Sequence, residues 1–526
     1  MSRRGARATS FHLASTGIAF AGSLLTAGVL GAGQAAAATT GCAALVTLSI
    51  PNTTITSATM VPATDTTPAY CNVLATVAPQ TDIRLQLPSN WKDRYLHLGG
   101  GGFDGNIPTN APAAYNVNLL GEGYAIGASN GGHRAAQYPG PTFAGNQQLV
   151  LGYAYTAIGD TDTVARALIQ AYYGKPAHYR YFDGCSNGGK NASVAASRFR
   201  KDYDGVIGGD GVWGHADDHV GGGDMAGLTA VWARVVNATS KVNPATFPAK
   251  LTALYNAQLA KCDAQDGLAD GIISNPRKCR FDPAALACTG GVDTPSCLNP
   301  TELAAVKTLQ SDLVLDRQVI GAPFAVGNLV SGLSAVVGGG QALGQGFLAM
   351  AYNNPAYAIS SFNLERDFAF ISNQFGKVDD MTGALRGIAK YVSEGGKLIV
   401  WTGAEDPLVP PLGSLRFVQR LREASEGGFD NVRLYDVPGV NHCGGGPGAD
   451  SINLLTPIAN WVEKGVPPTK LIASKLNTAG AVTFTRPLCP FPEWAKYTGG
   501  PASSASSFRC VRSDDDDHHR HESMAH

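Results

Sequence analysis

Short apolar runs alternate with segments of helical periodicity in two parts of the chain, one on each side of a long irregular stretch. The apolar runs end at turn residues, which is typical of strands buried in a sheet. Strands that alternate with helices favour a mostly parallel sheet covered by helices on both faces. We therefore predict an α/β fold, with strands at 95–98, 124–128, 179–182, 397–401 and 432–435 and helices at 164–173 and 190–199.

The alternation is lost between residues 211 and 385. This stretch is rich in Gly and Pro, holds four of the ten cysteines, and is too long to be a loop. We predict a second domain here, inserted into a main domain that residues 39–210 and 386–512 form.

Both ends of the chain differ from the rest. Basic residues precede an apolar stretch at 13–33, and Ala36 to Ala38 offer a cleavage site before Thr39, which favours a signal peptide over residues 1–38 and hence secretion, extracellular or periplasmic. A membrane anchor is the alternative, disfavoured because the stretch is rich in Gly and Ser and cleavable. The polar tail, 513–526, is expected to be disordered, although its acidic and histidine side chains could also bind a metal ion.

Composition narrows the possible partners. Hydrophobic residues make up 44% and charged residues 15% of the chain, so most of it should fold. The net charge is −1 and no basic stripe with interleaved aromatic residues occurs, which argues against nucleic acid. No later segment is apolar for long enough to span a membrane, so we expect no membrane association after signal cleavage.

The chain has ten cysteines, and an even number in an exported protein predicts disulfides. The sequence alone leaves hundreds of pairings open. Spacing along the chain favours four local pairs, which leaves Cys185 and Cys443 for each other. The local pairs are Cys42–Cys71, Cys262–Cys279, Cys288–Cys297 and Cys489–Cys510.

Ser186 lies in a G-x-S-x-G sequence, residues 184–188, between a predicted strand and a predicted helix. This is the context of a nucleophile elbow, but the motif alone is weak in a chain with 64 glycines. His442, after the last predicted strand, could take the serine proton, although a lone loop histidine usually has no such role. Cys185 lies beside the serine and Cys443 beside the histidine, so if Ser186 and His442 meet, the two cysteines meet with them.

Asp406 follows the strand at 397–401 and would orient the histidine. It preserves the chain order Ser, acid, His of α/β-hydrolases. Glu405 is the neighbouring alternative, and Asp450 breaks the order because it follows the histidine.

Two backbone N–H groups should bind the oxyanion of the reaction. One is that of Asn187, the residue after the serine. The other is expected from Gly101 or Gly102, in a run of four glycines after an early strand. Such a run could also be just a flexible turn.

An acidic loop lies in the insertion, where Asp263, Asp266 and Asp270 occur close together with Gly267 and Gly271. Carboxylate oxygens suit Ca²⁺, and the glycines permit sharp turns around an ion. An exposed acidic loop without a metal is the equal alternative.

Together, the Cys185–Ser186 pair, Asp406, the His442–Cys443 pair and the acidic loop resemble the tannase and feruloyl esterase family. That family also includes the bacterial enzyme that hydrolyses mono(2-hydroxyethyl) terephthalate. The chain departs from it at Asn187, where Thr or Glu is usual. Further similar segments are 172–174, 395–399, 437–439, 461–465 and 486–490.

The resemblance implies an α/β-hydrolase with a lid domain over the site. It implies a triad of Ser186, Asp406 and His442, joined by a Cys185–Cys443 disulfide, and it supports the local disulfide pairs.

The resemblance also implies a structural Ca²⁺. Its ligands would be the side chains of Asp263, Asp266 and Asp270 and the carbonyls of Leu268 and Ile272.

We therefore expect a secreted serine esterase that hydrolyses small carboxylic esters of aromatic, phenolic acids through an acyl-enzyme, feruloyl esters first. Galloyl esters and terephthalate monoesters are the alternatives. A non-catalytic ligand-binding protein on the same scaffold is a further alternative, which the presence of all three triad candidates disfavours.

Overall fold

The computed structural model describes residues 39–214, 224–325, 341–377 and 385–512. The predicted signal peptide and polar tail lie outside these residues, as do parts of the insertion. No helix in the described residues combines the length and the apolar composition needed to cross a membrane.

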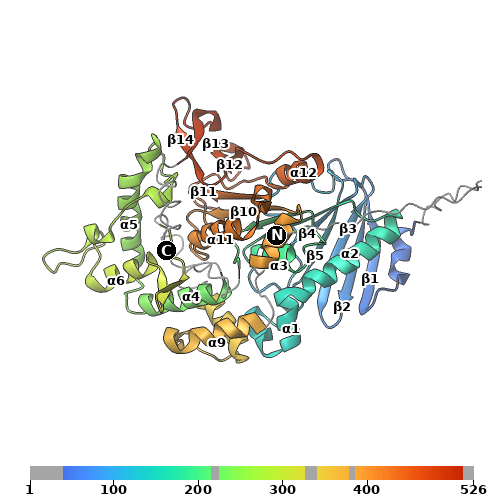
Figure 1. Ribbon diagram of the computed structural model, residues 1–526, viewed down its shortest axis with the longest axis horizontal. Coiled ribbons are helices and arrows are strands. Elements are labelled where there is room, and N and C mark those ends of the chain that lie inside the picture. Colours follow the sequence, from blue (N-terminus) through green and yellow to red (C-terminus); the bar gives the residue numbers. More distant parts are fainter. Residues whose placement is uncertain (1–38, 215–223, 326–340, 378–384, 513–526) are drawn as a thin grey trace, which may run out of the picture. The chain divides into compact units, whose positions relative to one another are not determined.

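Within the described residues, a nine-stranded sheet runs through the main domain in the order β1-β2-β3-β5-β4-β6-β7-β10-β11 (Figure 1). The pairs from β5 to β11 are parallel, whereas β1, β2, β3 and β5 pair antiparallel. The predicted α/β fold with a mostly parallel sheet is confirmed. The strands are β1 (Thr53–Val61), β2 (Tyr70–Val77), β3 (Thr81–Pro88), β4 (Arg94–Leu98), β5 (Tyr124–Ser129), β6 (Tyr179–Cys185), β7 (Gly205–Gly209), β10 (Lys397–Gly403) and β11 (Val432–Val437).

All five predicted strands occur, as β4, β5, β6, β10 and β11. The antiparallel strands β1 to β3 and the central strand β7 were not predicted. Strand β7 contains three glycines and therefore resembles a turn in sequence. In the sheet, a side chain at Gly208 or Gly209 would collide with the ring of Trp213 or Trp401, respectively, so glycine is required for packing rather than for a turn.

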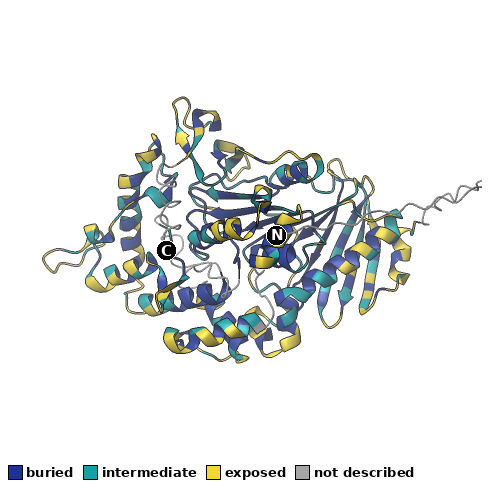
Figure 2. Ribbon diagram, viewed as in Figure 1, coloured by how far each residue is buried: buried dark blue, intermediate teal, exposed yellow. Residues whose placement is uncertain are grey.

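Strands β4, β5, β6, β7 and β10 are buried on both faces, whereas β1 to β3 alternate between buried and more exposed residues. Along β10, Leu398 and Val400 pack into one apolar core and Ile399 and Trp401 into another, as the alternation of side chains along a strand requires. Helices α2, α3, α10 and α11 contribute to the first core and α12 to the second, and Figure 2 shows the strands as largely buried. These helices are α2 (Ala157–Tyr173), α3 (Asn187–Ser197), α10 (Leu385–Ser393), α11 (Pro411–Ala424) and α12 (Leu455–Lys464).

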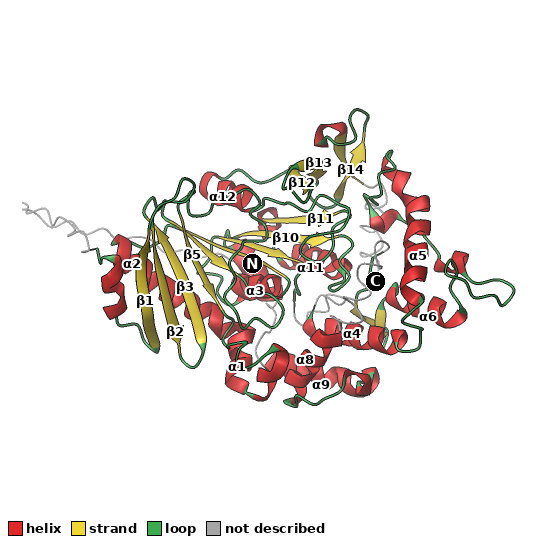
Figure 3. Cartoon of the chain, turned by 180° about the vertical axis from the view of Figure 1, so that it is seen from behind, coloured by secondary structure: helices red, strands yellow, loops and turns green. Residues whose placement is uncertain are grey.

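The insertion is mainly helical and lies beyond the β7–β11 part of the sheet, away from β1 to β3 (Figure 3). Its helices surround an apolar core of their own, to which Phe143 and Tyr153 of the main domain contribute. The described residues belong to one compact unit, and the division at residues 211 and 385 stays a prediction. The helices and strands here are α4 (Met225–Thr239), α5 (Phe247–Cys262), α6 (Pro300–Leu309), β8 (Leu313–Leu315), β9 (Gln318–Gly321), α8 (Gln341–Tyr352) and α9 (Leu364–Lys377).

Short elements complete the description. Before α2, the chain forms α1 (Gln147–Leu151) and one turn of π-helix (Gly152–Thr156), and after α12 it forms two hairpins. The hairpin strands are β12 (Leu471–Leu476), β13 (Val482–Leu488), β14 (Glu493–Tyr497) and β15 (Phe508–Arg512). The 3-10 helices are η1 (Cys42–Thr47), η2 (Gly140–Gly145), η5 (Asp263–Asp266), η6 (Pro276–Lys278), η7 (Pro283–Leu286), η9 (Ile359–Ser361), η10 (Gly428–Asn431) and η11 (Ala505–Ser507).

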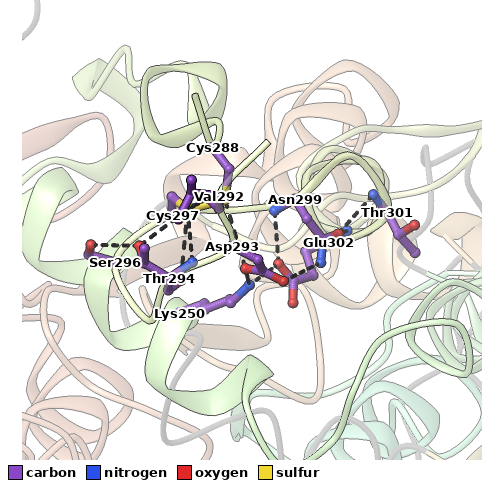
Figure 4. Close-up of a disulfide and its surroundings, with 10 residues drawn as sticks. All are labelled: Lys250, Cys288, Val292, Asp293, Thr294, Ser296, Cys297, Asn299, Thr301 and Glu302. Atoms are coloured by element: carbon purple, nitrogen blue, oxygen red, sulfur yellow. Dashed lines mark hydrogen bonds and ion pairs between the residues drawn. A yellow bond between two sulfur atoms is a disulfide. The ribbon is translucent and has the colours of Figure 1, made fainter. Parts of the chain in front are cut away.

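All ten cysteines pair as predicted, in five disulfides. Four of them close short local loops. Figure 4 shows one, Cys288–Cys297, in a loop that the buried Lys250 also anchors through ion pairs with Asp293 and Glu302. The fifth, Cys185–Cys443, joins residues 258 positions apart.

Candidate active site

Ser186 lies at a sharp turn between β6 and α3. Its backbone has φ 62° and ψ −121°, a conformation that non-glycine residues rarely adopt. A side chain at position 184 would come within 2.5 Å of the carbonyl oxygen of Gly188. The outer glycines of the motif are therefore required by close backbone packing, which leaves the serine at the tip of the turn.

Ser186, His442 and Asp406 form a continuous hydrogen-bonded chain. His442 Nε2 lies 2.8 Å from Ser186 Oγ, and its Nδ1 lies 2.7 Å from Asp406 Oδ2. The other oxygen of Asp406 accepts hydrogen bonds from the N–H groups of Leu408 and Val409, at 2.7 and 3.0 Å. The buried carboxylate is thus fixed on both sides, with one oxygen directed at the imidazole.

The other two carboxylates considered have different surroundings. Asp450 forms an ion pair with Lys475 at 3.2 Å and accepts the N–H of Gly445 at 2.8 Å. Glu405 is buried next to Asp406, but the imidazole contact belongs to Asp406. The geometry therefore favours Asp406 as the acid.

The electrostatics of His442 are dominated by opposing effects. Burial lowers its pKa, but the charge of Asp406 and the hydrogen bond to it outweigh burial and raise the pKa from 6.5 to about 9. The imidazolium is thus stabilised at this position. A histidine that takes the serine proton during attack requires this property.

The Cys185–Cys443 disulfide joins the residue before the serine to the residue after the histidine, with a Cα–Cα distance of 5.9 Å. Cys443 has a φ of 58°. The covalent bond limits how far the serine turn and the histidine loop can separate.

The N–H of Asn187 belongs to the first residue of α3, where N–H groups lack an intrahelical partner. Its side chain donates to Asp104 Oδ2 at 2.8 Å. Gly102 borders the serine together with Asn187, and its carbonyl accepts from the hydroxyl of Tyr153 at 3.0 Å. Gly101 accepts the N–H of Asp104 at 2.8 Å. Asp104 thus links the serine turn to the glycine loop, residues 99–102. Gly101 and Gly102 both remain candidates for the second oxyanion donor.

A buried lysine, Lys190, lines the same cavity as Ser186 and Asn187. Lys190 donates to the carbonyl of Tyr153 at 2.9 Å, and its ammonium lies 4.4 Å from the centre of that ring. Burial lowers the pKa of Lys190 and raises that of Asp104, and the attraction between the two charges opposes both shifts. The two groups therefore interact electrostatically.

Two cavities border Ser186 from different sides. A narrow one of about 30 Å³ is lined by apolar side chains of the insertion, including Leu228, Trp232 and Phe347. A wider groove of about 480 Å³ extends between the glycine loop and Tyr115 and passes the Cys185–Cys443 disulfide. A substrate at Ser186 could therefore place an apolar group in the narrow cavity and a more polar group in the groove.

The acidic loop is closely hydrogen-bonded. Asp263 accepts the N–H groups of Asp270 and Gly271, at 3.1 and 2.8 Å, and Asp266 accepts that of Leu268 at 2.8 Å. Asp270 accepts the N–H of Ile272 at 3.3 Å. A carboxylate oxygen has two lone pairs, so each can accept a further contact.

Two electrostatic features bear on a cation here. Burial raises the pKa of Asp266, and the charges of Asp270 and Asp263 raise it further. Asp270 also forms an ion pair with Arg486. The loop fits a cation by its donor chemistry, and Arg486 already supplies part of the compensating charge.

Three polar residues of the site, the half-buried Asp104 and the buried Lys190 and Asp210, were not predicted from the sequence. Lys190 lies on α3 two residues after the serine motif, and this position was the only feature of the sequence that pointed to the site. Asp104 follows the glycine run, and Asp210 follows the glycine-rich strand β7, which the sequence pattern did not predict. Their contacts depend on which strand ends become neighbours.

The chain is similar to known proteins along most of its length. The family model described as tannase and feruloyl esterase matches residues 66–327 and 344–511. An uncharacterized esterase of Xanthomonas campestris pv. campestris is 31% identical, covering 91% of this chain and 92% of that protein. The mono(2-hydroxyethyl) terephthalate hydrolase of Piscinibacter sakaiensis is 30% identical, covering 84% and 85%. A probable feruloyl esterase of Arthroderma benhamiae is 31% identical, covering 81% and 82%.

Solved structures are similar in fold. The crystal structure of feruloyl esterase B from Aspergillus oryzae has a TM-score of 0.77 at 23% identity, covering 89% of this chain and 99% of that one. Tannin acyl hydrolase from Aspergillus niger has a TM-score of 0.62 at 21% identity, covering 88% and 92%.

Proposed function

Because this chain belongs to the tannase and feruloyl esterase family, whose members are carboxylic ester hydrolases, we propose that it hydrolyses esters of aromatic, phenolic acids with Ser186 as the nucleophile. The observation that carries the proposal is the hydrogen-bonded chain from Ser186 through His442 to Asp406. The ester class follows from the family and from the apolar side chains beside the serine.

The proposed reaction proceeds through an acyl-enzyme. Ser186 Oγ attacks the ester carbonyl while His442 Nε2 takes its proton, and Asp406 stabilises the imidazolium. The N–H of Asn187 and that of Gly101 or Gly102 bind the oxyanion. The C–O bond to the alcohol then breaks, and His442 returns the proton to the departing oxygen. A water molecule, activated by His442, hydrolyses the acyl group from Ser186.

The two cavities suggest how the ester is oriented. We place the aromatic acyl group in the apolar cavity and the alcohol in the wider groove, because Leu228, Trp232 and Phe347 offer apolar surface and the groove is more polar. A cavity of about 30 Å³ holds little more than a water molecule. The side chains of the insertion must therefore move apart when the acyl group binds.

Replacing the nucleophile tests the proposal. Ser186→Ala should abolish turnover, with kcat reduced about 10⁶-fold, the scale seen when a triad nucleophile is lost. Ser197→Ala is the matched control, because this serine is buried on the same helix and its hydroxyl donates to the backbone carbonyl of Val194 at 3.3 Å. Full turnover by Ser186→Ala would reject the assignment.

A substrate panel ranks the ester classes. We expect methyl ferulate to be hydrolysed with the highest kcat/KM, followed by methyl gallate and the terephthalate monoester. The reverse order would assign the chain to one of the alternative classes. Binding of all three esters without turnover would favour a ligand-binding protein.

We also propose that the acidic loop binds a structural Ca²⁺ through the side chains of Asp263, Asp266 and Asp270 and the carbonyls of Leu268 and Ile272. Support comes from the repulsion among the three carboxylates, which raises the pKa of Asp266 beyond the effect of burial alone. A bound cation would relieve that repulsion and stabilise the loop.

Calcium content and unfolding test this site. At free Ca²⁺ of about 100 times its Kd, the free energy of unfolding should rise by about 2.7 kcal/mol relative to protein in chelator. Asp263→Ala with Asp270→Ala should lose both the bound Ca²⁺ and this difference, whereas the exposed Asp65→Ala should keep them. Unchanged metal content in the double variant would reject the loop as the site.

We further propose that the protein is secreted and that its mature form begins at Thr39. Support comes from the basic and apolar character of residues 1–38 and from five disulfides, which persist in oxidising compartments. N-terminal sequencing of the exported protein tests the cleavage site.

A further inference from the structure

A buried carboxylate outside the triad lies where its three segments meet. Asp210 is fully buried and follows the last residue of β7, with a φ of 42°. The same strand end holds the nucleophile, because the carbonyl of Gly209 accepts the N–H of Ser186 at 2.9 Å. Strand β7 lies between β6, which leads to the serine, and β10, which leads to the acid.

The two oxygens of Asp210 bind different segments. Oδ1 accepts the N–H of Gly403 at 2.7 Å and the hydroxyl of Thr402 at 3.0 Å, both at the end of β10. Oδ2 accepts the N–H of Cys443 at 2.7 Å, next to the histidine and within the disulfide-linked loop. One side chain thus joins the strand before Asp406 to the loop that carries His442.

Asp210 also lies close to the reacting groups. An oxygen of Asp210, an oxygen of Asp406 and a ring nitrogen of His442 all lie within 4.8 Å of one another. Cys443 adopts a φ of 58°, which a non-glycine residue holds only when its surroundings enforce it. The hydrogen bond from its N–H to Asp210 and the disulfide to Cys185 are two such constraints.

We propose that Asp210 is a positioning residue for catalysis, which sets the distance between the acid-bearing strand and the histidine loop and, when ionised, adds a second negative charge near the imidazole. The inference rests on the proposed function. It assigns to Asp210 a role in the alignment of the triad in addition to its role in folding.

The charge of Asp210 has a measurable consequence. Burial raises its pKa, and the charge of Asp406 raises it further, while His442 and the N–H groups of Cys443 and Gly403 lower it. When ionised, Asp210 raises the pKa of His442 in addition to Asp406. Removal of this charge should lower the pKa of the histidine.

Asp210→Asn tests the proposal, because it keeps the size of the side chain but replaces one acceptor by an NH₂ group that cannot bind an N–H donor. One of the two segments therefore loses its hydrogen bond. We expect kcat to fall about 10- to 100-fold with KM within about threefold of wild type, since a misplacement of ~1 Å can cost about 10²-fold in rate. The midpoint of the kcat/KM pH profile should move to lower pH.

Asp183→Asn is the matched control. Asp183 is also fully buried, lies on the adjacent strand β6, and has a pKa raised by burial, but it accepts the N–H of Ala113 rather than a group of the triad segments. This variant should lose stability while the kcat of its folded fraction and its pH midpoint stay those of wild type. A normal kcat and midpoint in folded Asp210→Asn, with only a lowered Tm as in Asp183→Asn, would overturn the proposal.

If Asp210→Asn does not fold, Thr402→Val is measured instead, because it removes one donor to Asp210 at nearly constant volume. It should lower kcat a few-fold and move the midpoint in the same direction, and an unchanged kcat and midpoint would overturn the proposal. Ser186→Ala separates the two claims. Turnover in that variant would contradict the proposed function, whereas an inactive Ser186→Ala beside a normal Asp210 variant would contradict only this inference.

Discussion

Ser186, Asp210 and Cys443, which lie where the segments of the triad meet, have positive φ angles of 62°, 42° and 58°. Such conformations cost of order 1–3 kcal/mol each and persist only where surrounding contacts enforce them. Here those contacts are the hydrogen bonds of Asp210, the disulfide of Cys443 and the close packing of the glycines around Ser186. Backbone strain is therefore concentrated where the serine, the acid strand and the histidine loop meet.

The pKa of His442 provides a test at the level of single residues. Its net pKa is raised from 6.5 to about 9 because the Asp406 charge outweighs the effect of burial. Only the neutral imidazole can accept the serine proton, so activity should rise with pH toward that value. Asp406→Asn removes the charge, and we expect the midpoint of kcat/KM to shift to lower pH while kcat falls about 10⁴-fold.

The measurement is a pH profile with an activated aryl ester, corrected for spontaneous hydrolysis. Glu405→Gln serves as the control, because it removes a neighbouring buried carboxylate that does not make the imidazole contact, and its midpoint should match wild type. A midpoint that moves in Glu405→Gln and not in Asp406→Asn would show that Glu405, and not Asp406, is the acid of the triad.

At the level of elements, the ends of β6, β7 and β10 and the loop after β11 form the site. These strands are parallel neighbours, so their carboxyl ends meet at one edge of the sheet. The Cys185–Cys443 disulfide links the first and the last of the four. It therefore connects segments that contribute different parts of the reaction.

Removing this disulfide should affect both stability and catalysis. Chain-entropy arithmetic gives about 5.6 kcal/mol for a closed loop of 258 residues and about 2.6 kcal/mol for one of 9. Cys185→Ser with Cys443→Ser should thus lower the free energy of unfolding and reduce kcat about 10- to 100-fold, because the serine turn and the histidine loop can separate.

The matched control is Cys288→Ser with Cys297→Ser, in the loop that Lys250 also anchors through Asp293 (Figure 4). It should lower stability by less and leave kcat unchanged. Denaturant unfolding and kcat measured on the same preparations distinguish the two effects. A wild-type kcat without the Cys185–Cys443 bond would show that the fold alone holds the triad together.

At the level of the whole molecule, the apolar core of the insertion reaches the active site. Trp232 and Phe347 belong to that core and also line the narrow cavity beside Ser186. The main domain thus supplies the reacting groups, and the insertion supplies the surface that an acyl group would contact. Substrate preference should therefore change with substitutions in the insertion.

Leu343→Trp tests this division. Leu343 is half-buried and lines the narrow cavity, so a larger side chain should fill the space proposed for the aromatic acyl group. We expect kcat/KM for methyl ferulate to fall at least 10-fold and that for an acetate ester to stay within about threefold. Val314→Trp, at a position of the insertion that is 50% exposed, should change neither. An equal loss for both esters in Leu343→Trp would place the aromatic group elsewhere.

The sequence by itself identified the residues whose signals are local. Ser186 between a strand and a helix, Asp406 after a strand, and cysteines beside Ser186 and His442 are patterns that neighbouring residues encode. The cysteine neighbours also carried long-range information, because two residues that must meet bring their chain neighbours with them. The five predicted strands are apolar runs, for which burial and local pattern agree.

Tertiary structure alone decided what depends on the meeting of distant groups. The position of Asp210 between the segments of Asp406 and His442, the contact of Asn187 with Asp104, and the two cavities beside Ser186 arise only when separate strand ends become neighbours. Strand β7 illustrates the physical reason. Its glycines resemble a turn in sequence, and only the rings of Trp213 and Trp401 packed against them explain why this strand has no larger side chains there.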